Sequence, residues 1–458
     1  MIKTTMSLVK TDFTKEEIVE SGVWYGMSTL ITRLTAVINT FLIIYFLTLY
    51  EYGVFRLILS LVGIFQAFIL SGLDGVIRNE IAHYLKGSQP QKAAKLFFEY
   101  VFLKGSLAGF VWGVMIVFIN IYFSTIYDSN FTNILLLAST TLLLNFISDA
   151  SSMFYRGVGA ISLLSKMSVI AELVKLFMLI LIFWLLSPSI QSVFIVIIFS
   201  QIVSLGLYFV TAYRDLCVWW HERRSIKEFI IFTIVKNHGK WSLGNNVLSG
   251  LVTNGRNYII KFLLSTEAVA VWNLALSMFN LLYSVIPSDK FLKVFLPYKI
   301  ALKDLKVEYY KSYVKYLTMV YIGLMVAGWI GSVIMVNILF PAYKPALPIF
   351  YIVSLGLLVS GVNDFVAAYL YTLRYQKILF YRTLQRNILT ISLMFIFVHW
   401  LGFIGLGLEY LITNIFLTIF SYLSLIKLHP DLRLGLRDFY LTNGDWRHIG
   451  IRLWNLLR

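Results

Sequence analysis

Twelve apolar stretches, each of about 20 residues or more, follow one another along the chain and limit the folds that it can adopt. A hydrocarbon core about 30 Å thick requires roughly 20 helical residues to cross it. Lipid offers no hydrogen-bond partner to backbone amides, so each stretch is expected to be a helix. The stretches lie near 22–48, 54–84, 97–122, 131–156, 160–186, 190–213, 240–264, 267–297, 312–339, 346–373, 378–400 and 403–427. The sequence therefore predicts an all-α polytopic membrane protein with twelve transmembrane helices.

The composition excludes several other classes of protein. Apolar residues make up 59% of the 458 residues and charged residues 14%, whereas soluble domains carry about 25% charged residues. The net charge of +16 would suggest a nucleic-acid partner in a soluble protein, but here the cations lie between membrane-length segments. The single cysteine, Cys217, excludes an internal disulfide framework, and the six histidines lack the spacing of a zinc site. We expect no nucleic-acid partner, no metal site and no cofactor.

The distribution of lysine and arginine between the loops predicts the orientation. Loops on one side hold Lys86, Lys92, Lys95, Arg214, Arg223, Arg224, Lys227, Lys236, Lys240, Lys299, Lys303, Lys306, Lys311, Arg374, Lys377, Arg382 and Arg386. The opposite side shows little beyond Arg56, Lys261 and Lys344. Cytoplasmic loops carry the excess of cations, so this asymmetry places both termini in the cytoplasm. It predicts a multi-pass protein of the cell membrane.

An internal repeat divides the predicted helices into two sets of six. The segment Tyr45–Glu51 recurs as Lys261–Glu267, at an offset of 216 residues and after the first span of each half. Such parallel repeats are related by an axis along the membrane normal in transporters with a central cleft. We therefore predict an N-terminal lobe over 1–220 and a C-terminal lobe with a cytoplasmic tail over 221–458, related by pseudo-two-fold symmetry. The polar stretch 213–240 between them is predicted to be an interfacial helix, with Trp219 and Trp220 in the interfacial belt.

Cations inside the spans are the candidate substrate-binding groups. Arg33 in span one and Arg256 in span seven have no carboxylate within one turn and cannot reach a headgroup easily, so we expect both in a water-filled cleft. The guanidinium group suits phosphate, and several cations in one cleft favour an anionic headgroup. Lys175 in span five and Arg78 in span two are further candidates. The alternatives are that Arg78, Lys104 and Arg156 snorkel to the cytoplasmic surface, and that Glu172 and Lys175 neutralise each other.

Carboxylates inside the spans are the candidate ion-coupling groups. These are Glu172, Asp74, Asp289 and Asp364, and Asp149 lies in the inner half of span four. A coupling ion, H⁺ or Na⁺, would bind at one of them. Pro287 interrupts span eight, so it predicts either a hinge or a static kink.

Several segments resemble polysaccharide flippases of the multidrug/oligosaccharidyl-lipid/polysaccharide exporter superfamily. The similar segments are 50–55, 71–87 (SGLDGVIRNEIAHYLKG), 91–97, 155–159 and 267–275. The resemblance implies a two-lobe alternating-access transporter that flips a polyprenyl-diphosphate-linked oligosaccharide. Arg33 and Arg256 match positions where such flippases carry cavity cations. Gly255 stands where an acidic residue is common in relatives, so the coupling ion stays open.

Three functions remain to be compared. The leading one is an O-antigen-type flippase, a monomer that works beside glycosyltransferases and a polysaccharide polymerase in a membrane whose lipids surround it. The alternative within the superfamily is a cation-coupled multidrug exporter, although its drug-exporting members often place an acidic residue in span one, where this chain has Arg33. A membrane glycosyltransferase or polymerase is less favoured, because the outer loops are short and no nucleotide-binding glycine loop or Asp-x-Asp pair is present. The sequence thus favours a transporter over an enzyme.

Overall fold

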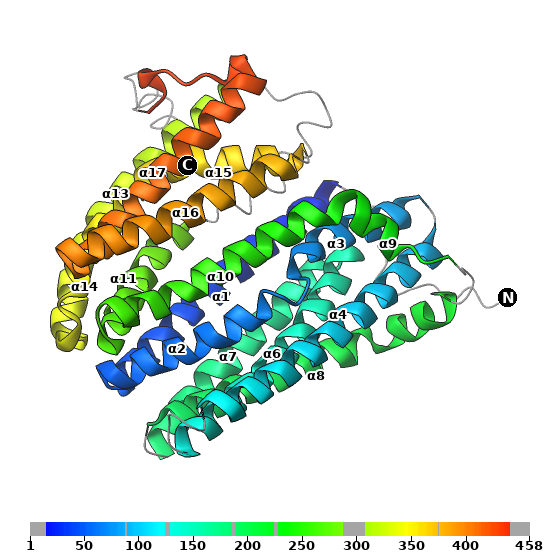
Figure 1. Ribbon diagram of the computed structural model, residues 1–458. Helices are drawn as coiled ribbons and strands as arrows, with labels where there is room; N and C mark the ends of the chain where they lie inside the picture. The colour runs from blue at the N-terminus through cyan, green and yellow to red at the C-terminus, as the bar shows by residue number, and fades with distance from the viewer. Residues whose placement is uncertain are drawn as a thin grey trace, which may run out of the picture. The chain divides into compact units, whose positions relative to one another are not determined.

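The computed structural model describes residues 15–87, 89–123, 129–185, 188–223, 228–286, 307–373 and 375–439. Its contacts divide the chain into two compact units, Met1–Ala270 and Val271–Arg458, and both are built from helices (Figure 1). The long helices of the first unit are α1 (Lys15–Phe46), α2 (Leu49–Gln66), α3 (Asp74–Lys86), α4 (Pro90–Phe118), α6 (Ser129–Gly157), α7 (Ile161–Leu185), α8 (Ile190–Glu222) and α10 (Lys240–Leu263). Those of the second unit are α11 (Thr266–Val285), whose first turn belongs to the first unit, α13 (Val307–Leu339), α14 (Ala346–Ser354), α15 (Leu357–Thr372), α16 (Gln376–Leu401) and α17 (Phe403–Leu428).

Every predicted span contains a helix. In the described part of the chain, ten helices are long and apolar enough to cross a membrane, and α14 with α15 forms an eleventh span that bends by 51° at its break. The remaining predicted span, 240–264, is α10, which is more polar because it carries Arg256 and four asparagines. The prediction of an all-α polytopic membrane protein is confirmed.

Span two is broken, whereas the sequence predicts one helix over 54–84. Helix α2 ends at Gln66, and a short 3₁₀ turn, η1 (Ser71–Leu73), precedes α3. Leu70 in the break has a positive φ of 49°, a conformation that costs about 1 kcal/mol or more for a non-glycine residue. The Tyr100 hydroxyl donates to the Leu70 carbonyl at 3.0 Å, which satisfies a backbone group that the break leaves without its helical partner. Contacts with another helix therefore stabilise a break that hydropathy cannot reveal.

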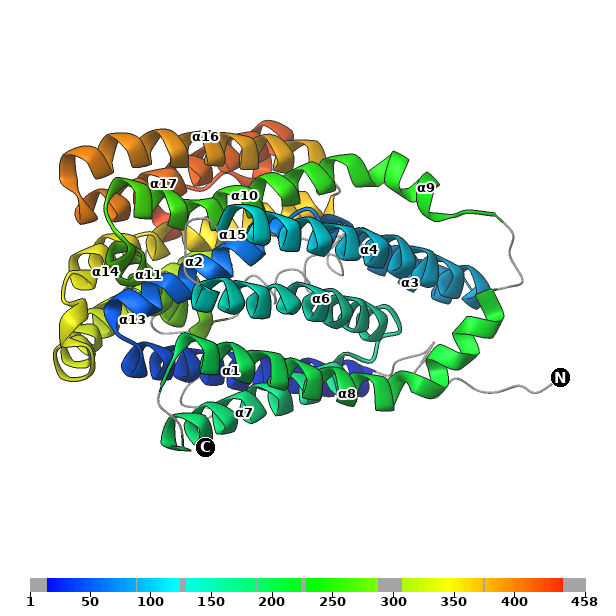
Figure 2. The same ribbon diagram turned by 60° about the horizontal axis from the view of Figure 1, so that its bottom comes forward.

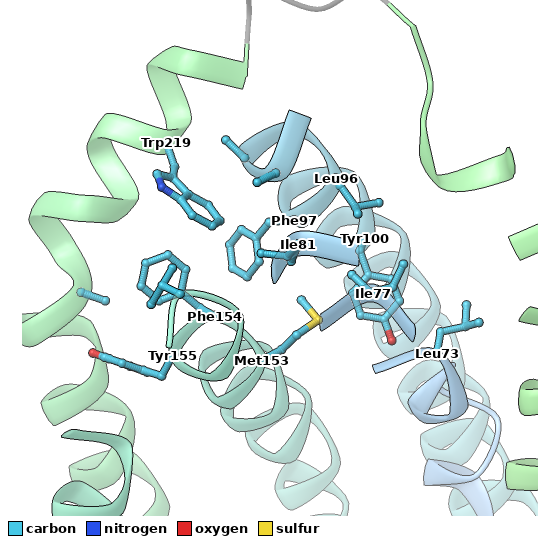
Figure 3. Packing of buried hydrophobic residues seen from close by; sticks show 14 of the residues in the cluster. Leu73, Ile77, Ile81, Leu96, Phe97, Tyr100, Met153, Phe154, Tyr155 and Trp219 are labelled. Carbon is cyan, nitrogen blue, oxygen red and sulfur yellow. The ribbon is translucent and has the colours of Figure 1, made fainter. Parts of the chain in front are cut away.

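The predicted interfacial helix over 213–240 is wrong. Helix α8 continues from span six to Glu222, and the chain then enters the short helix α9 (Ile231–Ile234) and a π-helical turn, η4 (Val235–Gly239). Trp219 is fully buried, and its ring packs at 5.0 Å from Phe154 and 5.8 Å from Phe97 between centroids (Figure 3). Trp219 therefore belongs to the core of the first unit, while Trp220 is 42% exposed as an interfacial residue would be.

Helix boundaries support the internal repeat along the whole chain. Moving the first-half boundaries by 216 residues reproduces those of the second half within three residues, for example from Ile161–Leu185 to Gln376–Leu401. A tertiary hydrogen bond recurs as well: Trp112 Nε1 donates to Ser139 Oγ at 3.2 Å, and Trp329 Nε1 donates to Ser354 Oγ at 2.7 Å. Each bond joins the third span of its half to the fourth. These repeated features support two six-helix halves, and the boundary at 220/221 stays a prediction.

A polar seam joins α10 to α2 within the first unit. The two helices lie side by side in both views (Figures 1 and 2), and small residues let their backbones approach closely. A Cβ added to Gly53 would meet the Thr266 carbonyl oxygen at 2.2 Å, and one added to Gly63 would overlap the Asn254 side chain. Asn257 Nδ2 donates to Ser60 Oγ at 2.7 Å, and Tyr258 Oη donates to the Leu57 carbonyl at 2.9 Å.

The polar seam continues beyond the end of α2. Ser242 Oγ donates to the Gly72 carbonyl in η1 at 2.6 Å, and a Cβ on Gly250 would meet the Ala67 Cβ at 2.6 Å. By the repeat α10 is the counterpart of α1 and opens the second half, yet its contacts place it in the first unit.

Candidate functional site

The four predicted substrate cations all lie in the first unit, on four different helices. Arg33 is on α1 and Lys175 on α7, and these two helices pack along each other. Arg256 is on α10, and Arg78 is on α3, directly after the η1 turn against which α10 packs. Each of the four side chains is half-buried. Their convergence on one cleft stays a prediction.

Glu172 is held by a hydrogen bond between α1 and α7. Asn39 Nδ2 donates to Glu172 Oε2 at 3.1 Å, and Asn39 is 1% exposed. Glu172 and Lys175 form no ion pair in the part of the chain that the structure describes. Glu172 is thus fixed one turn above or below the α1 residues near Arg33, and its role in ion coupling stays a prediction.

Asp74 belongs to an ion triad that the sequence did not indicate. Lys104 Nζ on α4 lies 2.9 Å from each carboxylate oxygen of Asp74 and 3.2 Å from Asp149 Oδ2 on α6. The Tyr100 hydroxyl donates to Asp74 Oδ1 at 2.6 Å. The Lys104 side chain is 1% exposed, so the expectation that it snorkels to the surface is wrong. It is buried because two carboxylates from neighbouring helices neutralise it, which is the usual condition for a lysine inside a protein.

Asp364 in the second unit lines a polar cavity of about 230 Å³. The cavity is bounded by Phe279, Asn280, Tyr283, Gly356, Val359, Ser360, Asn363, Asp364, Tyr410, Asn414 and Thr418. Asp364 is 7% exposed, and the Tyr283 hydroxyl donates to its Oδ1 at 2.8 Å. The carboxylate, amide and hydroxyl oxygens around this cavity have the chemistry to hold a small cation or a proton.

Arg382 and Arg386 are cations that the sequence analysis assigned to a loop. Both lie inside α16, in the span that follows the loop, and both are half-buried. Arg382 donates a hydrogen bond to Asn363, which lines the cavity beside Asp364. Both already fall within the predicted span 378–400, and this position is the signal that could have identified Arg382 and Arg386 as intramembrane cations.

Two predicted residues, Pro287 and Asp289, lie outside the described residues, as does the end of span eight. The hinge and the coupling role assigned to them stay predictions.

Known structures match the fold of the chain along most of its length. An inward-facing multidrug resistance MATE family transporter of the MOP superfamily is 14% identical, with a TM-score of 0.68 over 88% of this chain and 98% of that one. The lipid II flippase MurJ in an inward closed conformation is 14% identical, with a TM-score of 0.66 over 91% of this chain and 89% of that one. A MOP superfamily transporter from Pyrococcus furiosus, titled for a binding pocket of reverse polarity that suggests a different function, is also 14% identical, with a TM-score of 0.64 over 91% and 97%.

At this identity the structures establish the fold, which is that of the MOP superfamily transporters. No protein of curated function matches the chain. The sequence profile described as polysaccharide biosynthesis protein matches residues 18–288, more than half of the chain, and this span includes the broken span two, the ion triad and α10. The match confirms the resemblance carried by segments such as 71–87, and the chain belongs to the polysaccharide biosynthesis protein family.

Proposed function

We propose that the protein is a flippase that moves a polyprenyl-diphosphate-linked oligosaccharide from the cytoplasmic to the outer leaflet by alternating access. The family match over residues 18–288 carries the proposal, because it links a transporter fold to the synthesis of polysaccharides. The solved lipid II flippase shares this fold, and its title names a lipid as the cargo of that protein. A transporter of a lipid-linked sugar is the function that joins both facts.

The proposed diphosphate ligands are Arg33, Arg256, Lys175 and Arg78. Guanidinium and ammonium groups on membrane-spanning helices are costly unless they face water or an anionic partner, and a diphosphate supplies the charge that would compensate them. In the second unit Arg382 lies beside the Asp364 cavity and adds a fifth cation at membrane depth.

Ion coupling completes the proposal. A flippase that works in one direction needs an energy source that favours one state over the other, and an H⁺ or Na⁺ gradient can supply it. Asp364 is the most suitable of the predicted carboxylates, because it is buried, is bonded to Tyr283 and lines a cavity that can receive an ion. Asp74 and Glu172 remain the candidates in the first unit.

Removal of the protein from its host cell tests the substrate class. We expect loss of surface polysaccharide together with accumulation of the lipid-linked sugar in the membrane, because synthesis continues while transfer to the outer leaflet stops. Surface sugar is measured by lectin binding, and the lipid intermediate by extraction and mass spectrometry. The control is complementation by the intact gene, which should restore both.

A multidrug exporter is the second candidate, because multidrug resistance transporters are among the matching folds. It predicts the opposite pair of results: expression would raise resistance to cationic drugs, and removal would leave the surface polysaccharide unchanged.

A further inference from the structure

The ion triad on α3, α4 and α6 carries one more negative than positive charge. Lys104 has a single ammonium group, and it contacts the carboxylates of both Asp74 and Asp149. The two acidic side chains are 28% and 39% exposed, respectively, whereas the lysine is 1% exposed. An unbalanced charge on membrane-spanning helices is costly, and carboxylates that share one cation do not both stay ionised at little cost. One proton would balance the triad.

Asp74 is the carboxylate that is better stabilised as an anion. Both of its oxygens accept from Lys104 at 2.9 Å, and Oδ1 also accepts from Tyr100 at 2.6 Å. Asp74 is also the first residue of α3, a helix of 13 residues, where the helix dipole favours negative charge. Three donated bonds and a helix N-terminus all stabilise the ionised form.

Asp149 has much less support. It lies within α6, eight residues before the last residue of the helix, and it accepts one bond, from Lys104 at 3.2 Å. Arg156, two turns further along α6 and exposed, is the other cation that acts on this carboxyl group. The polar side chains on the neighbouring helices α2 and α8 are neutral: Gln66 and Gln201 both bond to Asn145, one turn before Asp149. Because Asp149 is the more exposed acid, water can bring a proton to it.

The repeat gives Asp149 a counterpart in the second unit. Asp364 follows it by 215 residues, one less than the repeat offset, and both lie in the fourth span of their half. Each is bonded by a side chain from an earlier span, Lys104 in the first unit and Tyr283 in the second. Each half therefore presents one acid at this depth.

We infer that Asp149 is a proton-binding site, where the carboxylate takes up one H⁺ from water to give the neutral acid while the Lys104–Asp74 ion pair stays intact. The use of this proton in transport rests on the proposed function. Binding neutralises the triad, and release restores its negative charge. The proton comes from the aqueous phase, so no other reactant is needed.

Infrared difference spectroscopy tests the site on the full-length protein in detergent. Between about pH 8 and pH 5 we expect a carboxylic-acid C=O band to appear, to be absent in Asp149→Asn and to be retained in the matched control Glu80→Gln. Lys104→Met removes the attraction that favours the anion, so the midpoint for Asp149 should rise by about one pH unit or more. Tyr100→Phe removes a donor to Asp74 alone and provides a milder second variant, whose Asp149 band should remain. Absence of any band that depends on Asp149 in this range overturns the inference.

Polysaccharide export across the same pH range tests the use of the proton. We expect the export rate of wild type to change with pH and that of Asp149→Asn to be low and independent of pH. A wild-type pH response in the variant overturns the role in transport, even if the infrared band is present. If instead the band depends on Asp149 but the wild-type protein moves no lipid-linked sugar, the proposed function fails and the proton site stands.

Discussion

A disulfide between Ser60→Cys and Asn257→Cys stops transport, and reduction restores it: this is the expected result of locking the polar seam between α2 and α10. The two native side chains are 2.7 Å apart between Oγ and Nδ2, and both residues are nearly fully buried. By the repeat these helices belong to different halves, so rocking of the halves in alternating access must separate them. The seam as observed is closed from Gly53 to Gly72, so a covalent lock holds the protein in one state.

The measurement compares oxidised and reduced protein in vesicles. The chain has one native cysteine, Cys217, so the pair is introduced in a Cys217→Ser background. The matched control joins two helices of the same half through Asn145→Cys and Gln201→Cys, whose native side chains are 2.8 Å apart. We expect oxidation to leave the control active. Full activity of the oxidised Ser60–Asn257 pair would show that α10 moves together with the first half, and that the boundary predicted at 220/221 is misplaced.

Alanine at Arg33 or at Arg256 abolishes transport while the protein remains folded and inserted. Removing one partner of a buried charge-assisted contact costs about 2–5 kcal/mol, which corresponds to roughly 30-fold or more in affinity for the diphosphate. Transport at low substrate concentration should fall by a similar factor. Thermal unfolding monitored in detergent, together with gel filtration, verifies that each variant is folded.

Two further variants give the arginine experiment its meaning. Arg33→Lys keeps the charge and loses the planar fork of donors, so we expect intermediate transport. Arg214→Ala removes an exposed cation on α8 that lies outside the proposed site, and it should transport as wild type does. Wild-type transport by both Arg33→Ala and Arg256→Ala would exclude them as substrate ligands.

The helices and their repeat could be predicted from the sequence because hydropathy is local. Apolar stretches identify spans whatever their neighbours are, and the short match at 45–51 and 261–267 gives the offset that the helix boundaries follow. Thr48 shows why that match is structural: it caps α2, its hydroxyl accepts from the Glu51 backbone amide at 3.2 Å, and Glu51 bonds back to it. A capping box ends one helix and begins the next wherever it occurs.

The break in span two and the ion triad could not be predicted, because both depend on contacts between distant residues. Nothing in the order of residues 66–74 shows that Tyr100 will bond to Leu70 or that Ser242 will bond to Gly72. Lys104 seemed close enough to the surface to snorkel, since its partners Asp74 and Asp149 are 30 and 45 residues away in sequence. Trp219 was misplaced for the same reason: a tryptophan near the end of a span is typical of an interface, and only the packing of Phe97 and Phe154 shows that it is buried.

Movement of a labelled polyprenyl-diphosphate-linked sugar across a protein-free lipid bilayer, with and without this protein inserted, is the most direct measurement of its function. The purified protein is reconstituted into sealed vesicles that carry the labelled lipid in both leaflets, and a membrane-impermeant reagent modifies the label on the outside. We expect vesicles with protein to expose their inner pool to the reagent, and vesicles with Arg256→Ala to retain it as protein-free vesicles do. Equal protection of the inner pool with and without the wild-type protein, in both orientations of an imposed pH or Na⁺ gradient, would contradict its proposed role as a flippase.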